Sequence, residues 1–133
     1  MKEELKYSLE KLENALIRLK QGAREAEDEL REDGVIQRFE FTFELFWKTL
    51  KIFLQYKGIE ARTPRDVFKE AFKLEWLADE KLFLDMLEDR NKTSHVYEKE
   101  TSREIFKRIR DNYILMVEAV LEKMKSKDPE FSA

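Results

Sequence analysis

An apolar residue recurs every three or four positions near the start of the chain, and this spacing limits the fold more than any other feature. The members of the series are Leu5, Leu9, Leu12, Leu16, Leu19, Ala23, Ala26 and Leu30. Intervals that alternate between four and three residues place side chains in one stripe along an α-helix. No run of the chain alternates with the period of two that a half-buried strand requires. The first segment is therefore predicted to be a helix that packs in a bundle.

Helix-breaking residues are rare, since only three glycines and two prolines occur in 133 residues. Glycine just after a helix and a capped proline at its first position mark helix ends and starts. The expected boundaries are a turn at Gly34, a cap at Gly58, and helix starts at Thr63-Pro64, Asp79 and Thr101 or Ser102. A second helix over 35–56 should bury a dense apolar face formed by Ile36, Phe39, Phe43, Phe46, Leu50 and Phe53.

These segments predict an all-α fold, an up-and-down four-helix bundle with one extra short helix, over residues 1–125, and a frayed tail over 126–133. The helix over 35–56 also carries Phe41, Leu45, Trp47 and Leu54 beside its main face. That is more apolar surface than one small bundle readily covers, and an exposed apolar patch usually marks a partner. A homodimer or a standing complex with another protein is expected.

The charge balance restricts the function. Charged residues make up 41% of the chain, yet the net charge is only -3. A protein that reads duplex DNA would be basic, so sequence-specific DNA binding is disfavoured, whereas a nucleotide or one RNA strand remains a candidate ligand. There are no cysteines, so cysteine metal sites and thiol nucleophiles are excluded. No apolar run reaches the length of a membrane span. We expect a cytoplasmic protein without a metal or cofactor.

Residues 90–97 read RNKTSHVY and contain the only histidine of the chain. On a continuous helix, Arg90 and Tyr97 would lie about 20° apart around the axis, whereas Arg90 and His95 would lie about 140° apart. The arginine and the histidine would converge if the helix loosened near Thr93, if the arginine curled back, or if two copies met across a dimer axis.

An arginine with a histidine suits phosphate chemistry. Guanidinium is a permanent bidentate phosphate ligand, and imidazole titrates near neutral pH. A ribose 2′-hydroxyl can attack its own phosphodiester when a base takes its proton and a cation stabilises the phosphorane, without a metal. Arg90 and His95 are the candidate catalytic pair. Asn91 or Ser94 could orient the phosphate, and Tyr97 could bind phosphate or accept a transferred group.

Structural roles would explain several of the same residues. A lone histidine near a helix end is most often a surface or capping residue, and Arg90 could belong to a solvated ion-pair network. Spacing alone favours this interpretation. Glu40 and Glu44 lie four residues apart and could bind a metal or act as acid and base. Exposure at an interface is favoured for this pair, because no histidine or cysteine accompanies them. Glu44 is kept as a supporting candidate.

The octet has the form R-N-x-x-x-H-x-Y, late in an all-helical chain. Together with IQRFEFTFELFWKTLK at 36–51, TPRDVFKEAF at 63–72 and LDMLEDRNKTSHVY at 84–97, it resembles the HepT-like group of HEPN domains, described as nucleotidyltransferase substrate-binding proteins. The likeness extends over residues 1–125. It implies a dimeric helical bundle encoded beside a small polymerase-β-type nucleotidyltransferase.

Some pairs of this kind behave as toxin and antitoxin. The resemblance then implies a metal-independent ribonuclease, with Arg90 and His95 as its catalytic pair and Asn91 in support. Tyr97 would be the residue that the partner adenylylates to silence the enzyme. The alternative within the same group is a non-catalytic subunit, in which these residues hold a nucleotide or the partner's substrate.

Overall fold

A computed structural model describes residues 2–93 and 98–127, and helices account for most of them. The elements are α1 (Lys2–Glu25), α2 (Glu29–Tyr56), α3 (Pro64–Lys73), α4 (Glu80–Lys92), α5 (Lys99–Arg108), the π-helical turn η2 (Ile109–Tyr113) and α6 (Ile114–Lys127). No strand occurs within the described ranges. The all-α bundle with an additional short helix, α3, is confirmed.

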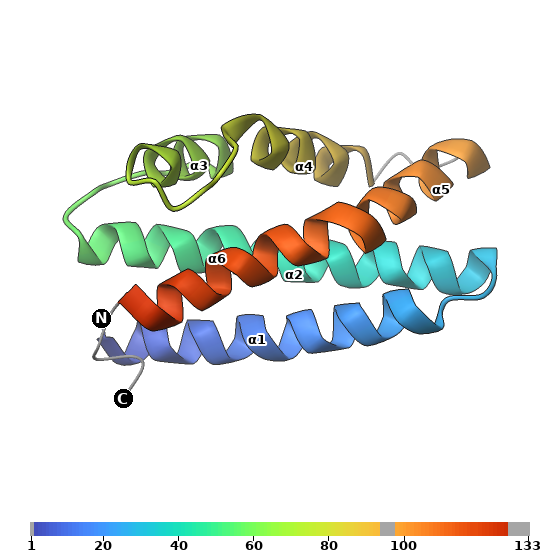
Figure 1. Cartoon of the computed structure of the whole chain (residues 1–133), viewed down its shortest axis with the longest axis horizontal. Helices are drawn as coiled ribbons and strands as arrows, with labels where there is room; N and C mark the ends of the chain where they lie inside the picture. The colour runs from blue at the N-terminus through green and yellow to red at the C-terminus, as the bar shows by residue number, and fades with distance from the viewer. Residues whose placement is uncertain (1, 94–97, 128–133) are drawn as a thin grey trace.

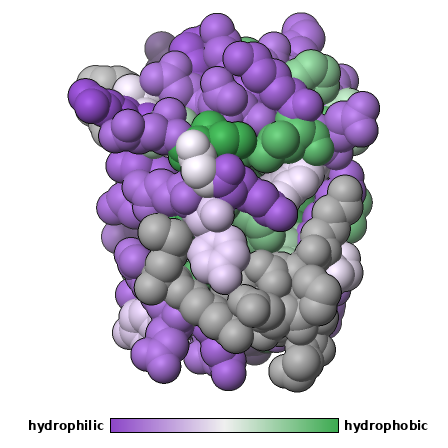
Figure 2. All heavy atoms as spheres, turned by 90° about the vertical axis from the view of Figure 1, so that its left-hand side faces the viewer, coloured by the Kyte–Doolittle hydropathy of each residue, from purple (hydrophilic) through white to green (hydrophobic). Residues whose placement is uncertain are grey.

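The two longest helices, α1 and α2, run antiparallel along the molecule (Figure 1). α3 and α4 follow each other along one side of α2, and the continuous rod α5–η2–α6 returns across the bundle (Figure 1). The start of α1 and the end of α6 lie at the same end of the molecule. The surface there is largely hydrophilic with a small hydrophobic area (Figure 2). α4 runs away from this end of the molecule. It finishes near α5 and near the first half of α2, toward the opposite end of the bundle.

The core forms along α2, whose expected apolar face is buried throughout. Phe43 and Phe46 both pack against Phe68 of α3, with ring centroids 5.9 Å apart in each case. Phe83 of α4 lies 5.9 Å from the same ring. Aromatic side chains bury a large apolar area each, so this cluster ties three helices together. Of the additional apolar residues of α2, Leu54 is buried and Leu45 and Trp47 are partly buried, whereas Phe41 is 60% exposed, which agrees with the excess of apolar surface predicted for this helix.

The turn between α1 and α2 lies earlier than predicted. α2 begins after Asp28, whose carboxylate accepts a hydrogen bond from the Arg31 amide at 2.9 Å. Leu30 therefore belongs to α2, and it is 81% exposed rather than part of the first stripe. Gly34 lies inside α2, where a glycine weakens a helix without ending it. The prediction of a turn at Gly34 was wrong because the regular spacing of leucines continues by chance across a capped helix start.

The remaining boundaries follow local chemistry. Gly58 has φ +81°. Its amide donates to the Gln55 carbonyl at 2.9 Å, and the Ile59 amide donates to the Leu54 carbonyl at 2.8 Å. This is the two-bond glycine cap of a helix C-terminus. Thr63 and Asp79 cap α3 and α4 as expected. α5 instead starts after Glu98, because the Ser102 hydroxyl bonds the Asp33 carboxylate at 3.0 Å instead of capping the helix. The prediction of a start at Thr101 or Ser102 was too late.

Candidate active site at the end of helix α4

The last turn of α4 is oriented by the apolar residues before it. Phe83, Met86 and Leu87 are buried, and they fix which side of the following turn faces the core. Asp89 points inward and is 5% exposed. Arg90 lies at the edge, with its side chain 27% exposed. The helix ends at Lys92, and the hydroxyl of Thr93 donates to the Arg90 carbonyl at 2.7 Å. α4 therefore ends next to Thr93, where loosening of the helix is one of the three ways that would bring Arg90 and His95 together.

Glu44 of α2 holds the Arg90 side chain. Nη2 of Arg90 lies 3.3 Å from Oε1 of Glu44, and the indole Nε1 of Trp47 donates to Oε2 at 3.2 Å. Nζ of Lys48 lies 3.6 Å from the same Oε2. One carboxylate thus accepts hydrogen bonds from a guanidinium and an indole and forms an ion pair with an ammonium group. Two cations, Arg90 and Lys48, therefore share the one carboxylate of Glu44.

A second cluster lies directly behind Arg90, and the sequence reasoning missed it. Both oxygens of the Asp89 carboxylate accept from Arg108, at 2.6 Å from Nε and 2.9 Å from Nη2. The Tyr113 hydroxyl also donates to Asp89. The hydrogen bonds to Asp89 raise the pKa of Arg108. Burial raises the pKa of Tyr113, and its hydrogen bond to Asp89 raises it further. The cluster anchors α4 to the rod formed by α5 and η2.

The π-helical turn explains how Tyr113 reaches this cluster. η2 spans Ile109–Tyr113, and both of these residues are buried. A π turn adds a residue to the helical repeat, and such turns occur mostly as single bulges, often at functional sites. Tyr113 then stacks on Phe39 of α2 with centroids 5.7 Å apart, and its hydroxyl points to Asp89. A π turn has no simple sequence signal, but an aspartate at a core-facing helical position could have indicated a buried partner.

The structure brings together two of the candidate residues named from the sequence, Arg90 and Glu44. Asn91 lies on the exposed side of the same turn of α4. Ser94, His95 and Tyr97 lie outside the described residues. Glu40 is half-buried one turn before Glu44, and within the described ranges no three His, Cys, Asp or Glu residues lie close enough to hold a metal ion.

The fold and this edge define an all-helical domain with an arginine presented at the end of its fourth helix. The chain belongs to the family of nucleotidyltransferase substrate-binding-like proteins, whose family model matches residues 5–126. The resemblance found in the sequence is thereby confirmed. None of the described helices is long and apolar enough to span a membrane.

Individual relatives agree with this assignment. The probable ribonuclease HepT of Haemophilus influenzae is 29% identical over 100 residues, 71% of this chain and 68% of that protein. A Thermus thermophilus protein solved by crystallography is similar, with a TM-score of 0.81, 38% identity, and coverage of 86% of this chain and 98% of that one.

The fold is also shared with a solved structure from Haemophilus influenzae, described as the fold of a substrate-binding domain of a nucleotidyltransferase. It matches with a TM-score of 0.68 and 24% identity, over 95% of this chain and 100% of that chain.

Proposed function

We propose that this protein is a metal-independent endoribonuclease that works with a small nucleotidyltransferase. The observation that carries the proposal is the position of Arg90. Its guanidinium is held partly exposed at the end of α4, five residues before the next candidate, His95, in the segment that begins at Ser94. The similarity to a relative named as a probable ribonuclease supports the same reaction class.

The proposed reaction is an internal transesterification. The His95 imidazole takes the proton of a ribose 2′-hydroxyl, and the 2′-oxygen forms a bond to the adjacent phosphorus. Arg90 stabilises the added negative charge on the phosphorane oxygens. The bond from phosphorus to the 5′-oxygen then breaks, and a protonated imidazole returns a proton to that leaving oxygen. The products are a 2′,3′-cyclic phosphate and a 5′-hydroxyl, and no oxidant or metal takes part.

The neighbouring polar residues have supporting roles in this proposal. Asn91 and Ser94 donate hydrogen bonds to the non-bridging phosphate oxygens. Glu44 orients the guanidinium of Arg90, which it contacts at 3.3 Å. When a phosphate approaches, Arg90 keeps the contact between its Nη2 and Glu44 and offers its other N–H groups to the phosphate.

Regulation is proposed at Tyr97. The partner nucleotidyltransferase would transfer AMP from ATP to the phenolic oxygen and release pyrophosphate. The added phosphodiester would carry a negative charge two residues after His95 and occupy the site where RNA phosphate binds. Co-expression with the partner should therefore add one AMP to the intact mass and abolish cleavage. An unmodified mass for Tyr97→Phe, alongside a modified wild type, would assign the residue.

RNA cleavage in EDTA by the protein expressed without its partner tests the enzyme directly. Wild type should cleave, whereas Arg90→Ala and His95→Ala should not. Arg65→Ala, which removes an exposed arginine on α3, is the matched control and should cleave as wild type does. Intact mass must show that all four proteins are unmodified. Equal cleavage by wild type and His95→Ala would reveal a contaminating nuclease and end the proposal.

A second function is a non-catalytic binding subunit that presents a nucleotide or substrate to the nucleotidyltransferase. The contact between Arg90 and Glu44 favours it, because the guanidinium already has a carboxylate partner in the isolated chain. In this case the protein would cleave no RNA. Arg90→Ala would still weaken the binding of a nucleotide by the complex with the partner.

A homodimer is part of both proposals. Large apolar side chains are exposed on several helices: Tyr7, Ile17, Leu30, Phe41, Leu82 and Leu115. Light scattering at micromolar concentration should give twice the chain mass of 16.1 kDa. A monomeric mass would contradict this part.

A further inference from the structure

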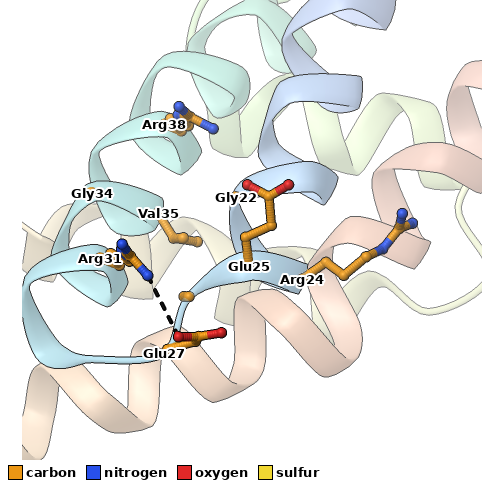
Figure 3. Close-up of a pocket in the computed structure, with 9 residues that line it drawn as sticks. Gly22, Arg24, Glu25, Glu27, Arg31, Gly34, Val35 and Arg38 are labelled. Atoms are coloured by element: carbon orange, nitrogen blue, oxygen red, sulfur yellow. Dashed lines mark ion pairs between the residues drawn. The ribbon is translucent and has the colours of Figure 1, made fainter.

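A groove between α1 and α2 has a lining suited to a nucleotide. It has a volume of about 520 Å³, and its walls include Arg18 from α1 and Gln37, Arg38 and Phe41 from α2. None of the residues that line it is acidic. A larger cavity of about 680 Å³ at the α1–α2 turn shares Gly34 and Arg38 with it (Figure 3). That cavity contains two glutamates, one of which pairs with an arginine of the same wall, so it is a poorer site for an anion.

Arg38 is held in place over the groove. Its Nη1 donates to the carbonyl of Arg18 at 3.0 Å, which fixes the guanidinium across the two helices. A guanidinium has five N–H groups, so the others remain available to a ligand. Arg18 has no side-chain partner among the described residues. The two arginines thus place positive charge in a groove whose lining contains no acidic residue.

Gly22 makes room for this arrangement. A Cβ atom at position 22 would lie 2.9 Å from Nη1 of Arg38, closer than real Cβ contacts. Gly34, on the facing helix, has nothing within 4 Å of its Cβ position, so the space above the α2 backbone is open. Glycine is a poor residue inside a helix, and both of these glycines line the larger cavity that adjoins the groove. Their shared effect is open space beside Arg38.

Phe41 supplies an aromatic surface to the same groove. Its side chain is 60% exposed, whereas the phenylalanines at positions 39, 43, 46 and 53 of α2 are buried. Glu44, the partner of Arg90, follows Phe41 by three residues, within one turn and about 60° around the axis. Glu44, which contacts Arg90, therefore follows the groove by less than one helical turn on α2.

We propose that this groove binds the RNA strand next to the cleavage site. Arg18 and Arg38 contact a phosphate, Phe41 stacks on a base, and the Gln37 amide can bond a base edge. The strand is single, because a paired base is stacked inside a helix and cannot lie on Phe41. The identity of the ligand as RNA rests on the proposed ribonuclease function, whereas the groove itself is defined by charge and shape.

The test measures binding separately from cleavage. The probe is a fluorescein-labelled oligouridylate with 2′-O-methyl groups, which lacks the attacking hydroxyl, and fluorescence anisotropy reports binding at several salt concentrations. Phe41→Ala should weaken binding about tenfold through lost stacking. Arg38→Ala should weaken it and reduce the salt slope by about one charge. Gly22→Ala should weaken binding by displacing Arg38 without unfolding α1.

Arg65→Ala is the matched control, since it removes an exposed arginine of α3 far from the groove along the chain. It should bind the probe as wild type does. Equal binding by wild type, Phe41→Ala and Arg38→Ala would overturn the groove assignment, even if wild type cleaves RNA. Weaker binding by these variants in a protein that never cleaves RNA would keep the groove and refute the ribonuclease.

The competing occupant is a second copy of the chain. If Phe41→Ala converts a dimer to a monomer in light scattering and leaves RNA binding per chain unchanged, the groove is an interface between copies and the proposal fails. An unchanged mass together with weaker RNA binding supports it.

Discussion

Replacing Asp89 by alanine should destabilise the protein more than any other single change near the Arg90 site. The Asp89 carboxylate, with a side chain 7% exposed, accepts two bonds from Arg108 and one from Tyr113. Alanine would leave a guanidinium and a phenol without their acceptor. A buried ion pair adds little net stability compared with an apolar substitute, but removing one partner of it is costly.

The magnitude follows from the exposure of the residue that is left behind. Breaking a buried ion pair costs about 3–5 kcal/mol. The Arg108 side chain is 39% exposed, so water can reach part of it, and we expect the lower value of about 3 kcal/mol. For a domain whose total stability is about 5–15 kcal/mol, this loss would lower the Tm by roughly 10 °C.

Urea unfolding followed by far-UV circular dichroism measures this effect, with Asp89→Asn as the matched variant. Asparagine keeps the volume and one acceptor oxygen, so Asp89→Asn should lower the free energy of unfolding by about 1–2 kcal/mol. In a double-mutant cycle, Asp89→Asn and Tyr113→Phe should be coupled, because they remove two ends of one hydrogen bond. A loss below about 1 kcal/mol for Asp89→Ala would refute the reasoning, since the carboxylate would then contribute nothing beyond a surface ion pair.

Three further outcomes are expected. Glu75 is exposed and has φ 63° just after the C-terminal cap of α3. Its replacement by glycine should raise the free energy of unfolding by about 0.5–1 kcal/mol, and its replacement by alanine should not raise it, as measured by urea unfolding. Because the pKa of Tyr113 is raised, the folded protein keeps a proton that the unfolded chain loses near pH 10. Stability should therefore fall as the pH rises above about 10, and less steeply in Tyr113→Phe; unfolding at about pH 9 and 11 checks this. Glu44→Gln should change stability by less than about 1 kcal/mol but lower RNA cleavage in EDTA roughly tenfold, because it no longer orients Arg90; unchanged cleavage would exclude that role.

The helices could be predicted because their signals are local. Apolar spacing identified the buried faces of α1 and α2, and the pairs Thr63-Pro64 and Lys57-Gly58 marked a start and an end through backbone chemistry. The errors arose where two local signals compete. Asp28 caps α2 while the leucine spacing runs on, and Ser102 resembles a cap but bonds Asp33 of another helix. Such a choice depends on tertiary contacts that no window of sequence contains.

The candidate site was predictable to a smaller extent. Residue chemistry identified Arg90, and helical spacing marked Glu44 as polar on an apolar helix, but only the fold shows that the two meet across 46 residues of chain. The Asp89 cluster escaped because Asp89 and Arg108 each resemble an ordinary surface residue in a sequence rich in charged residues. Its third member, Tyr113, lies at the end of the π turn, and a π turn has no simple sequence signal.

Asp89 and Arg90 are consecutive, and this adjacency explains how one turn of helix can be fixed accurately enough for chemistry. Residues one apart in a helix point about 100° away from each other, so Asp89 binds the α5–η2 rod while Arg90 binds α2. The end of α4 is thus held from two sides by ion pairs. α4 supplies the carboxylate in the pair with Arg108 and the guanidinium in the pair with Glu44. Rotation of α4 about its own axis would stretch both pairs at once.

The segment that contains His95 starts two residues beyond Lys92, so its starting point is set by these same contacts. A variant that breaks the Asp89 pair but folds, such as Asp89→Asn, should therefore impair RNA cleavage more than its modest loss of stability explains, and full activity in that variant would show that α2 alone positions Arg90.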